Sequence, residues 1–353
     1  MKKLNKYRKI FKNKKILITG HTGFKGSWLS AIFTLFGAKI YGISNGYPTK
    51  PSLFKMMQFQ NIRSYFFDLS NLNKLKKTFN EIKPDYVFHM AAQTIVKKSY
   101  THPIETWNSN LNSTLNILEV LRTYKNKCNA VLITSDKCYQ NIEKKNGYVE
   151  NDRLGGDENY SASKAACEIL FRSYFISFFK NQKKIRLSTV RAGNVIGGGD
   201  WAENRIVPDI FRSLENNDTL VIRYPNATRP WQHVVEPLMG YIDLSVKLKL
   251  NNKLSGESFN FGPYKSNYSV LEILKIVKKN INYFKWKIEK PKKIKETMLL
   301  QLNCQKALKK ILWKSKFTFK ETITETIFWY QNYKKIGCKD ITNSQIKSYL
   351  SRL

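Results

Sequence analysis

The sequence predicts an α/β protein with a doubly wound parallel sheet and a smaller C-terminal substrate-binding domain. Short apolar runs typical of strands alternate with helical segments from residue 15 to residue 195. This alternation is the pattern of βαβ units, whose strands run parallel. From Gly197 onward the pattern loosens into turns rich in Gly, Asn and Pro. A chain of 353 residues also exceeds what one hydrophobic core usually organises.

The predicted elements follow one another regularly. The first strand, KILITG at residues 15–20, is apolar and ends in glycine, and the helical stretch SWLSAIFTLFGA follows at residues 27–38. Further apolar runs predict strands at residues 38–44, 62–69, 85–92, 129–136 and 185–195. Helices are expected at residues 71–82, 108–124 and 161–179. Because right-handed crossovers bring the carboxyl ends of parallel strands to one edge, ligands should bind there.

The remaining segments predict a second, smaller domain. The run TLVIRY at residues 219–224 predicts a further strand, and ETIFWYQNY at residues 325–333 ends a basic helical tail. We expect a first domain at residues 1–195 and a smaller one built mainly by residues 196–353. Some segments of the second range are expected to return to the first domain.

Composition argues against several classes of protein. A hydrophobic fraction of 42% is enough to offset chain entropy, so disorder is not expected. The longest uncharged apolar run, residues 27–38, is too short to cross a bilayer, and lysines interrupt the N-terminus where a signal peptide would be apolar. Five cysteines without a CxxC pair and four histidines without metal spacing argue against disulfides or a metal site. We expect a cytoplasmic protein with no metal and no membrane partner.

The net charge of +35 leaves a polyanion-binding alternative open, because a basic protein releases counterions when it meets phosphate. The lysines are spread along the chain among many Asn and Ile, and no RNP, zinc-finger or helix-turn-helix signature accompanies them. We favour a solvated basic surface that attracts anionic metabolites, and expect no nucleic-acid partner.

The first functional motif is a glycine turn between the first strand and the first helix. Gly20, Gly23 and Gly26 are spaced G-x-x-G-x-x-G. Glycine lets the backbone turn tightly and approach a pyrophosphate, whose charge then lies at a helix N-terminus. A strand before the motif and a helix after it are the context that a Rossmann-type dinucleotide site requires. A glycine-rich turn that binds nothing is the alternative.

The pair Tyr160 and Lys164 is a candidate general base. The two residues lie one helical turn apart on the same face of a predicted helix. A nearby ammonium favours the phenolate, which makes a usable base from a phenol that is otherwise too weak. An ordinary surface Tyr and Lys are the alternative, because such strings are common.

These motifs and the HMAA strand end at residues 89–92 together resemble the extended short-chain dehydrogenase/reductase superfamily over essentially the whole chain. More narrowly, seven ordered blocks resemble the CDP-glucose branch of the nucleotide-sugar 4,6-dehydratases. The blocks are GHTGFKGSWL (20–29), PSLF (51–54), AAQ (91–93), TSDKCY (134–139), RAGNVIGGGDW (191–201), RIVPD (205–209) and RPWQHV (229–234). Seven blocks in order are far more specific than any single motif.

The resemblance implies a hydro-lyase that converts CDP-D-glucose to CDP-4-keto-6-deoxy-D-glucose and water. In this family NAD takes a hydride from sugar C4, a base removes the C5 proton, water leaves from C6, and the hydride returns to C6. Carried onto this chain, Tyr160 deprotonates the C4 hydroxyl and Ser135 hydrogen-bonds the C4 oxygen. Lys164 lowers the pKa of Tyr160 and holds the nicotinamide ribose.

Elimination of water needs an acid and a base in one site, and the neighbours Asp136 and Lys137 lie at the end of a predicted strand. The resemblance implies that Asp136 donates to the C6 hydroxyl and that Lys137 removes the C5 proton. Relatives that act on dTDP- and GDP-sugars carry Asp-Glu here, and lysine is the pattern of the CDP-glucose branch. A lysine base must be neutral, so its pKa has to be depressed. An exposed salt-bridging turn is the alternative, and a second C5 base stays open.

NAD is the expected cofactor, although the second strand runs into Ser44-Asn45-Gly46 where an acidic residue commonly holds the adenosine ribose. Charge alone therefore leaves NAD and NADP undecided. The expected cofactor-binding residues are Gly20, Thr22, Gly23, Phe24, Lys25, Gly26, Asp68, Leu69, Ala91, Ala92, Tyr160 and Lys164.

Guanidinium groups match the geometry of phosphates, so two arginines are candidates for the diphosphate and ribose of the substrate. The expected substrate-binding residues are Gln93, Ser135, Asn194, Arg205 and Arg229. Trp201 and Trp231 are expected to pack in the interior rather than stack on a base, and Asn110 to anchor a water near Tyr160.

Three alternatives stay open. Another nucleotide-sugar dehydratase or an epimerase of the same superfamily would also use Ser135 and Tyr160, but an epimerase would not need Asp136 and Lys137. A basic RNA- or polyanion-binding protein and a non-catalytic NAD-binding module are the others. By resemblance we expect a homodimer, or an oligomer built from it, that pairs through the helices at residues 108–124 and 161–179. A role in deoxysugar synthesis for surface polysaccharide would follow.

Overall fold

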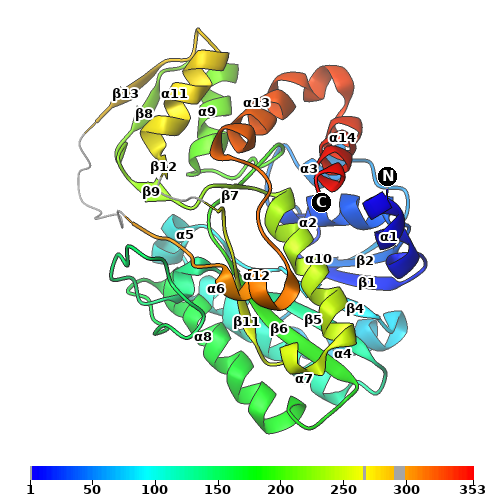
Figure 1. Ribbon diagram of the computed structural model, residues 1–353. Coiled ribbons are helices and arrows are strands. Elements are labelled where there is room, and N and C mark those ends of the chain that lie inside the picture. The colour runs from blue at the N-terminus through cyan, green and yellow to red at the C-terminus, as the bar shows by residue number, and fades with distance from the viewer. Residues whose placement is uncertain (1, 265–267, 290–298) are drawn as a thin grey trace.

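The computed structural model, which describes residues 2–264, 268–289 and 299–353, has at its centre a seven-stranded sheet in the order β11-β6-β5-β4-β1-β2-β3 (Figure 1). Every neighbouring pair runs parallel. The strands are β1 (Lys15–Thr19), β2 (Lys39–Ser44), β3 (Ile62–Phe66), β4 (Tyr86–His89), β5 (Cys128–Ile133), β6 (Ile185–Ala192) and β11 (Ser258–Phe261). The chain moves outward from β1 to β3 and then returns to β4 on the other side of β1. The sheet is therefore doubly wound, as predicted.

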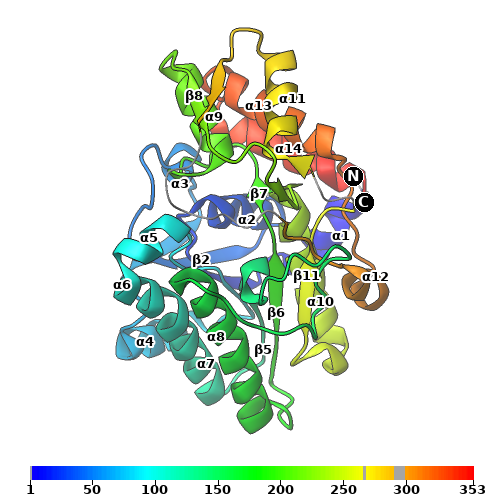
Figure 2. The same ribbon diagram turned by 90° about the vertical axis from the view of Figure 1, so that its left-hand side faces the viewer.

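Helices cover both faces of this sheet, and β1 shows why. Ile16 and Ile18 lie in one hydrophobic cluster while Leu17 lies in another, because alternate residues of a strand point to opposite faces. Figure 2 shows α4, α7 and α8 on one side of the sheet and α10 on the other. The main covering helices are α2 (Phe24–Leu35) and α10 (Val235–Leu250) in the first cluster, and α4 (Leu72–Ile82), α7 (Ser113–Thr123) and α8 (Asn159–Tyr174) in the second.

The predicted helices agree with the structure in position but not in internal geometry. The helix predicted at residues 108–124 is a π-helical turn, η1 (Asn108–Asn112), followed by α7. The helix predicted at residues 161–179 begins as α8 and ends as a second π-helical turn, η3 (Phe175–Phe179). Both predicted helices are confirmed in position, and the π-helical turns within them could not be predicted, because an apolar repeat does not reveal one extra residue per turn.

A group of helices and short strands forms a second region at one end of the sheet (Figure 1). The predicted strand at residues 219–224 is shorter than expected, and the predicted helical tail is confirmed as α13. The elements are β7 (Val195–Ile196), α9 (Ile206–Glu215), β8 (Leu220–Ile222), β9 (Thr228–Arg229), β10 (Gln232–His233), β12 (Tyr268–Ser269), α11 (Val270–Asn280), β13 (Trp286–Ile288) and α13 (Phe319–Ile336).

Two segments from after residue 196 belong to the sheet region. β11 pairs with β6, and α10 packs on β5 and β6. The division of the chain at residue 195 remains a prediction. The remaining elements are α1 (Lys2–Phe11), α3 (Leu53–Met56), α5 (Val96–Thr101), α6 (Pro103–Trp107), η2 (Asp136–Cys138), η4 (Asn252–Leu254), α12 (Gln305–Ile311) and α14 (Cys338–Ser351).

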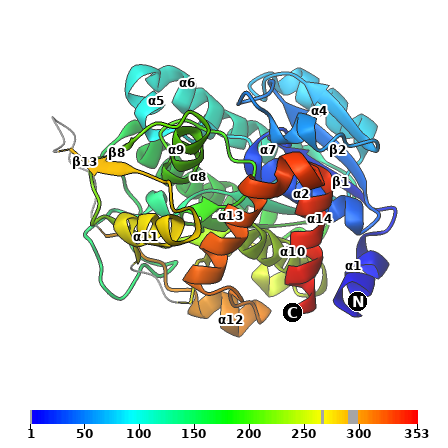
Figure 3. The ribbon, with the colours of Figure 1, turned by 90° about the horizontal axis from the view of Figure 1, so that it is seen from above.

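Helix α10 anchors both ends of the chain. The buried carboxylate of Glu236 accepts hydrogen bonds from the backbone N–H groups of Lys316 and Phe317, at 2.7 and 2.6 Å, and from the Tyr349 hydroxyl of α14 at 2.7 Å. The Tyr7 hydroxyl of α1 donates to Asp243 at 2.6 Å. The two termini consequently lie side by side (Figure 3).

Candidate active site

The glycine turn lies at the carboxyl end of β1, at the centre of the sheet. Gly20 has a φ of +72°, and a Cβ there would stand 2.9 Å from the backbone of Ala91, at the end of β4. A Cβ on Gly26 would stand 2.2 Å from the Gly20 carbonyl oxygen. Gly23 is the N-cap of α2 and carries no side chain to cap it. The N–H groups of the first turn of α2 therefore face a position suited to an anion.

The other predicted cofactor residues lie along the same edge of the sheet. The Thr22 hydroxyl donates to the Gly46 carbonyl at 2.6 Å and so ties the turn to the segment after β2. Asp68 follows β3, and its carboxylate accepts from the backbone N–H of Ser70 at 2.8 Å. Leu69 is buried, and Ala91 and Ala92 follow β4. The structure thus brings the ends of four adjoining strands, β4, β1, β2 and β3, to one edge of the sheet.

A histidine of the glycine turn, His21, packs beside the end of β2, where the strand runs into Ser44-Asn45-Gly46. The His21 ring contacts the hydroxyls of Ser44 at 3.0 Å and Ser64 at 2.9 Å. Burial lowers the pKa of His21 to about 4, so the ring is neutral at physiological pH. A Cβ on Gly42 would stand 2.2 Å from this ring. The sequence reasoning missed this packing role, for which a histidine inside the glycine motif was the available signal.

Tyr160 and Lys164 lie on α8 and are brought to the end of β5. The helix starts with a capping box in which the Glu158 side chain accepts from the Ser161 N–H. Tyr160 is 8% exposed and Lys164 4%, and the Lys164 ammonium stands 6.0 Å from the centre of the Tyr160 ring. Burial raises the pKa of Tyr160 to about 12, while a hydrogen bond with Ser135 and the charge of Arg205 oppose the rise. Burial lowers the pKa of Lys164.

Asp136 forms the acid candidate of the site. Its Oδ1 accepts from the Ser135 hydroxyl at 3.0 Å, and its Oδ2 is buried with no hydrogen-bond partner among the described residues. Burial raises the pKa of Asp136, and the charges of Lys137 and Arg229 partly oppose this. Burial therefore favours the protonated form of this carboxyl group, which is the form that a proton donor needs. A Cβ on Gly193 would stand 2.9 Å from Oδ2, which explains the glycine there.

Lys137 follows directly in the short helix η2 and is partly buried. Its backbone N–H donates to the Ser135 hydroxyl oxygen at 3.2 Å, so the Ser135 side chain fixes the turn that carries both members of the pair. The structure therefore joins Ser135, Asp136, Lys137, Tyr160 and Lys164 at the junction of β5 and α8, where η2 and α8 are in contact.

The two predicted arginines add positive charge to this junction. Arg205 donates to Asp200 and to the Thr94 hydroxyl, both at 2.8 Å, and so connects the start of α9 to the loop after β4. Arg229 is buried on β9 and donates to the Thr228 carbonyl at 2.8 Å. Their charges influence Tyr160 and Asp136, respectively. Both arginines therefore lie within electrostatic reach of the candidate acid and base.

Lys25 also belongs to this charged cluster. Burial and the charge of Arg205 lower the pKa of Lys25 to about 8, while Asp136 raises it and Lys164 lowers it. The sequence placed Lys25 only beside a phosphate, whereas the structure also sets it within electrostatic reach of the candidate catalytic residues.

The predicted polar ligands Gln93 and Asn194 are placed differently. The Gln93 carboxamide oxygen accepts from the Ile95 N–H at 2.5 Å, and its NH₂ donates to the Thr106 hydroxyl at 3.0 Å. The Gln93 NH₂ also donates to the Ile95 carbonyl at 3.1 Å, so both of its hydrogens are used within the protein. Asn194 follows β6 and is partly buried.

Asn110, which was expected to anchor a water near Tyr160, is buried and uses its side chain for contacts within the protein. Its Oδ1 accepts from the Gln93 N–H at 2.9 Å and its Nδ2 donates to Ser163 at 2.8 Å. Trp201 and Trp231 are buried and confirm the predicted packing role. His233 is also buried and lies edge-on to the Trp28 ring.

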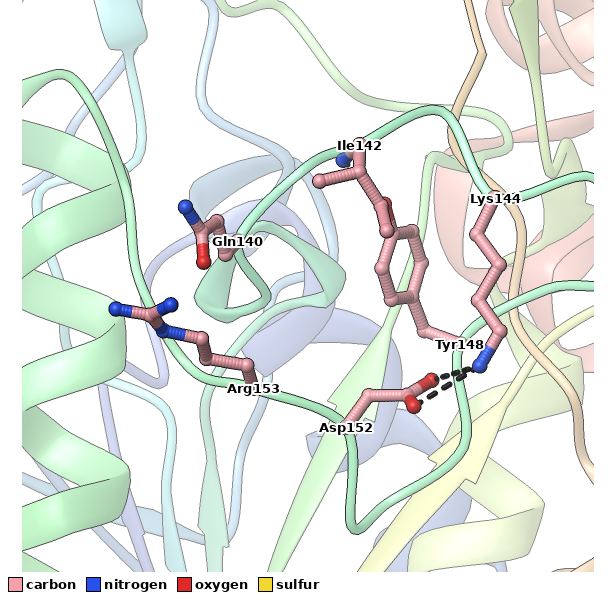
Figure 4. Close-up of a pocket in the computed structure, with 6 residues that line it drawn as sticks. All are labelled: Gln140, Ile142, Lys144, Tyr148, Asp152 and Arg153. Atoms are coloured by element: carbon pink, nitrogen blue, oxygen red, sulfur yellow. Dashed lines mark hydrogen bonds and ion pairs between the residues drawn. The ribbon is translucent and has the colours of Figure 1, made fainter.

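A cavity of about 400 Å³ is lined by residues 140–153, which follow the candidate catalytic turn in the chain (Figure 4). Its lining residues are Gln140, Ile142, Lys144, Tyr148, Asp152 and Arg153. The Lys144 ammonium pairs with both carboxylate oxygens of Asp152, at 2.9 and 2.7 Å. None of the predicted site residues is part of this lining, and the sequence reasoning did not find it.

Two further observations concern what else the chain holds. Across residues 2–264, 268–289 and 299–353, no helix is long and apolar enough to cross a membrane. In the same ranges, no three His, Cys, Asp or Glu side chains gather into a group that could hold a metal ion.

Comparisons with known proteins place these features in context. A family model described as GDP-mannose 4,6-dehydratase matches residues 17–326. The chain is 40% identical over 333 residues to CDP-glucose 4,6-dehydratase of Salmonella typhimurium strain LT2, which covers 92% of each protein. It is 23% identical to CDP-paratose 2-epimerase of Salmonella typhi, over 89% of this chain and 98% of that protein.

Solved structures share the fold at lower identity. An epimerase from Methanothermobacter thermautotrophicus superposes with a TM-score of 0.81 at 21% identity, over 95% of this chain and 96% of that one. A dTDP-glucose 4,6-dehydratase from Bacillus anthracis, in complex with NAD, gives 0.73 at 20% identity, over 91% and 98%. The predicted architecture is thus confirmed.

Proposed function

The chain belongs to the GDP-mannose 4,6-dehydratase family, and from this premise we propose that it is a hydro-lyase that converts CDP-D-glucose to CDP-4-keto-6-deoxy-D-glucose and water. The observation that carries the proposal is the 40% identity, across 92% of both chains, to a CDP-glucose 4,6-dehydratase. The acid candidate Asp136 beside Lys137 supports an elimination, because an epimerase needs no such pair.

NAD is the proposed cofactor, and the glycine turn fits it. The Gly20 and Gly26 positions have no room for a Cβ, so the backbone can approach a pyrophosphate there. When bound, NAD supplies the hydride acceptor for sugar C4 and the hydride donor for C6. The residues proposed to hold it are Gly20, Thr22, Gly23, Phe24, Lys25 and Gly26 at the pyrophosphate, Asp68 and Leu69 at adenine, Ala91 and Ala92 along its length, and Tyr160 and Lys164 at the nicotinamide ribose.

Tyr160 is proposed to take the proton of the C4 hydroxyl while Ser135 hydrogen-bonds the C4 oxygen. The pKa of about 12 is too high for a base at neutral pH, so positive charge has to stabilise the phenolate. Lys164 lies beside the ring, and the charge of Arg205 acts in the same direction. Lys164 and Arg205 are therefore the cations proposed to support this role.

Lys137 is proposed to remove the C5 proton, and Asp136 to donate a proton to the C6 hydroxyl so that it leaves as water. One proton moves to the base and one from the acid, so the elimination balances. Burial raises the pKa of Asp136 and so favours the protonated carboxyl group that this role needs. Arg205, Arg229, Asn194 and Gln93 are the proposed contacts to the nucleotide diphosphate and the sugar.

A homodimer through α7 and α8 is also proposed. Apolar side chains project from the outer face of α8 and its π-helical end, where Ile169 is 59%, Ile176 54% and Phe178 47% exposed. Such exposed apolar surface favours association with a second copy.

Five unpaired cysteines suit the reducing cytoplasm, where we propose the enzyme acts in deoxysugar synthesis.

Incubation with CDP-, dTDP-, GDP- and UDP-glucose in deuterated water tests the function, with products followed by mass spectrometry and proton NMR. The expected product forms from CDP-glucose, has lost water and has exchanged deuterium at C5. Loss of water from another nucleotide sugar alone would replace the substrate, and inversion at C4 without water loss would make the chain an epimerase. Binding of NAD with no change in any sugar would favour a non-catalytic module.

A further inference from the structure

A buried ion pair lies directly behind the candidate catalytic residues. Glu168 follows Lys164 by four residues on α8, and Arg191 lies on β6. Their side chains are 2% and 3% exposed, and Arg191 donates to Glu168 at 2.7 Å. No role for this pair followed from the sequence.

The Glu168 carboxylate connects the catalytic helix to three strands. Its Oε1 accepts from the hydroxyl of Thr134, the residue immediately before Ser135. Its Oε2 accepts from Thr189 on β6 at 2.8 Å and from Ser258 on β11 at 3.0 Å. Four donors, including Arg191, thus converge on one carboxylate.

Arg191 reaches the other flank of the same turn. Its guanidinium donates to the Tyr139 hydroxyl at 2.8 Å and to the Glu150 carbonyl at 2.9 Å. The Tyr139 hydroxyl in turn donates to Asn260 on β11 at 2.7 Å. Thr134 and Tyr139 bracket Ser135, Asp136 and Lys137, so one ion pair holds the turn on both sides.

Stability alone does not account for this arrangement. Removing two charges from water is costly, and well-packed apolar residues often stabilise a core as well as a buried pair does. Hydrogen bonds from charged groups, however, fix distance and direction, and here they end on residues that flank the candidate catalytic turn.

We propose that Glu168 and Arg191 are positioning residues that fix the Ser135–Asp136–Lys137 turn relative to Tyr160 and Lys164. This inference rests on the proposed function. Oxidation at C4 and elimination across C5 and C6 use groups from two elements, the turn and the helix, on a single bound sugar. The ion pair sets the distance between those elements without touching the substrate.

The test compares Glu168→Gln and Thr134→Val with Glu236→Gln, a matched control that also neutralises a buried, multiply bonded carboxylate. Because a misplacement of about 1 Å can cost about 100-fold in rate, Glu168→Gln should lower kcat on CDP-glucose by about that factor. Its KM should change less than about threefold, since ligand contacts stay in place. Thr134→Val, which removes one hydroxyl, should lower kcat by about tenfold. Glu236→Gln should lower the melting temperature and leave the kcat of folded protein unchanged.

Equal kcat for Glu168→Gln and Glu236→Gln, once corrected for folded fraction, would overturn the positioning role. If Glu168→Gln does not fold, Thr134→Val decides alone, and wild-type kcat in that variant would refute the role. A wild-type chain that dehydrates none of the four nucleotide sugars would overturn the proposed function and this inference together. An active wild-type chain with active variants would overturn the inference alone.

Discussion

The pKa of Tyr160 offers the sharpest test of the site, through the substitution Tyr160→Phe. Burial raises this pKa from 10.0 to about 12 in the structure. A rise of two units corresponds to about 2.7 kcal/mol against the phenolate. Because the folded chain then holds the phenolic proton longer than the unfolded chain, stability falls as pH rises from about 10 to about 12. Tyr160→Phe escapes that loss.

The assay is the tyrosinate absorbance at 295 nm, recorded as the difference between wild type and Tyr160→Phe in the cofactor-free protein. The difference should stay flat to about pH 10.5. Tyr86→Phe is the matched control, because burial also raises the pKa of Tyr86 to about 12, yet Tyr86 lies on β4 outside the site. The two difference absorbances, wild type minus Tyr160→Phe and wild type minus Tyr86→Phe, should titrate over the same pH range. Only Tyr160→Phe should lose about 10³-fold in kcat.

A titration step at or below pH 10 in the wild-type minus Tyr160→Phe difference would refute the reasoning that burial dominates at this site. An equal loss of kcat in Tyr86→Phe would show that removing any buried hydroxyl is harmful. The first result would show that neighbouring groups outweigh burial at Tyr160, and the second would withdraw the specific role of Tyr160 as a base.

Three other predictions follow from the same geometry. Lys137→Met should lower dehydration by at least about 100-fold and keep NAD affinity, as NMR and a binding titration would measure; unchanged turnover would remove Lys137 from the mechanism. Gly26→Ala should destabilise the folded protein by about 1–3 kcal/mol, because the new Cβ would stand 2.2 Å from the Gly20 carbonyl oxygen. Gly23→Ala is the control, since a Cβ there would stand 3.4 Å from the same oxygen. Equal melting temperatures of the two variants would contradict this prediction. Burial lowers the pKa of His21 from 6.5 to about 4, so the folded chain holds this ring neutral and its stability falls by about 3 kcal/mol as pH falls from about 6.5 to about 4. Urea unfolding at pH 7 and pH 4 should show this loss of stability. An equal loss in His21→Asn would refute the role of His21.

Six of the seven strands could be predicted, because each falls in an apolar run that alternates with helical segments. The first of them, β1, is apolar on both faces. Ile16 and Leu17, for example, enter different clusters. The glycine turn was equally predictable, since Gly20 and Gly26 occur at a fixed spacing after a strand. These features depend on residues that are close in the chain.

What could not be predicted depends on contacts between distant residues. The sequence of β11 does not indicate that it pairs with β6. The Glu168–Arg191 pair joins a helix residue to a strand residue 23 positions later in the chain. The π-helical turn η1 aligns Asn110 with Ser163 and Gln93, which no helical repeat reveals. The interaction of Lys25 with Asp136 could not be predicted either, because only the packing of the chain brings the two charges close to each other.

The late arrival of β11 has a consequence for synthesis on the ribosome. Ser258 follows Glu168 by 90 residues, so the nascent chain makes α8 long before it makes the last donor to that carboxylate. Until Phe261 has emerged, β6 is an uncovered sheet edge, and such an edge is a template for pairing with other chains. While residues 196–261 are translated, this edge stays open to pairing with other chains, so we expect chaperone protection to matter during that interval.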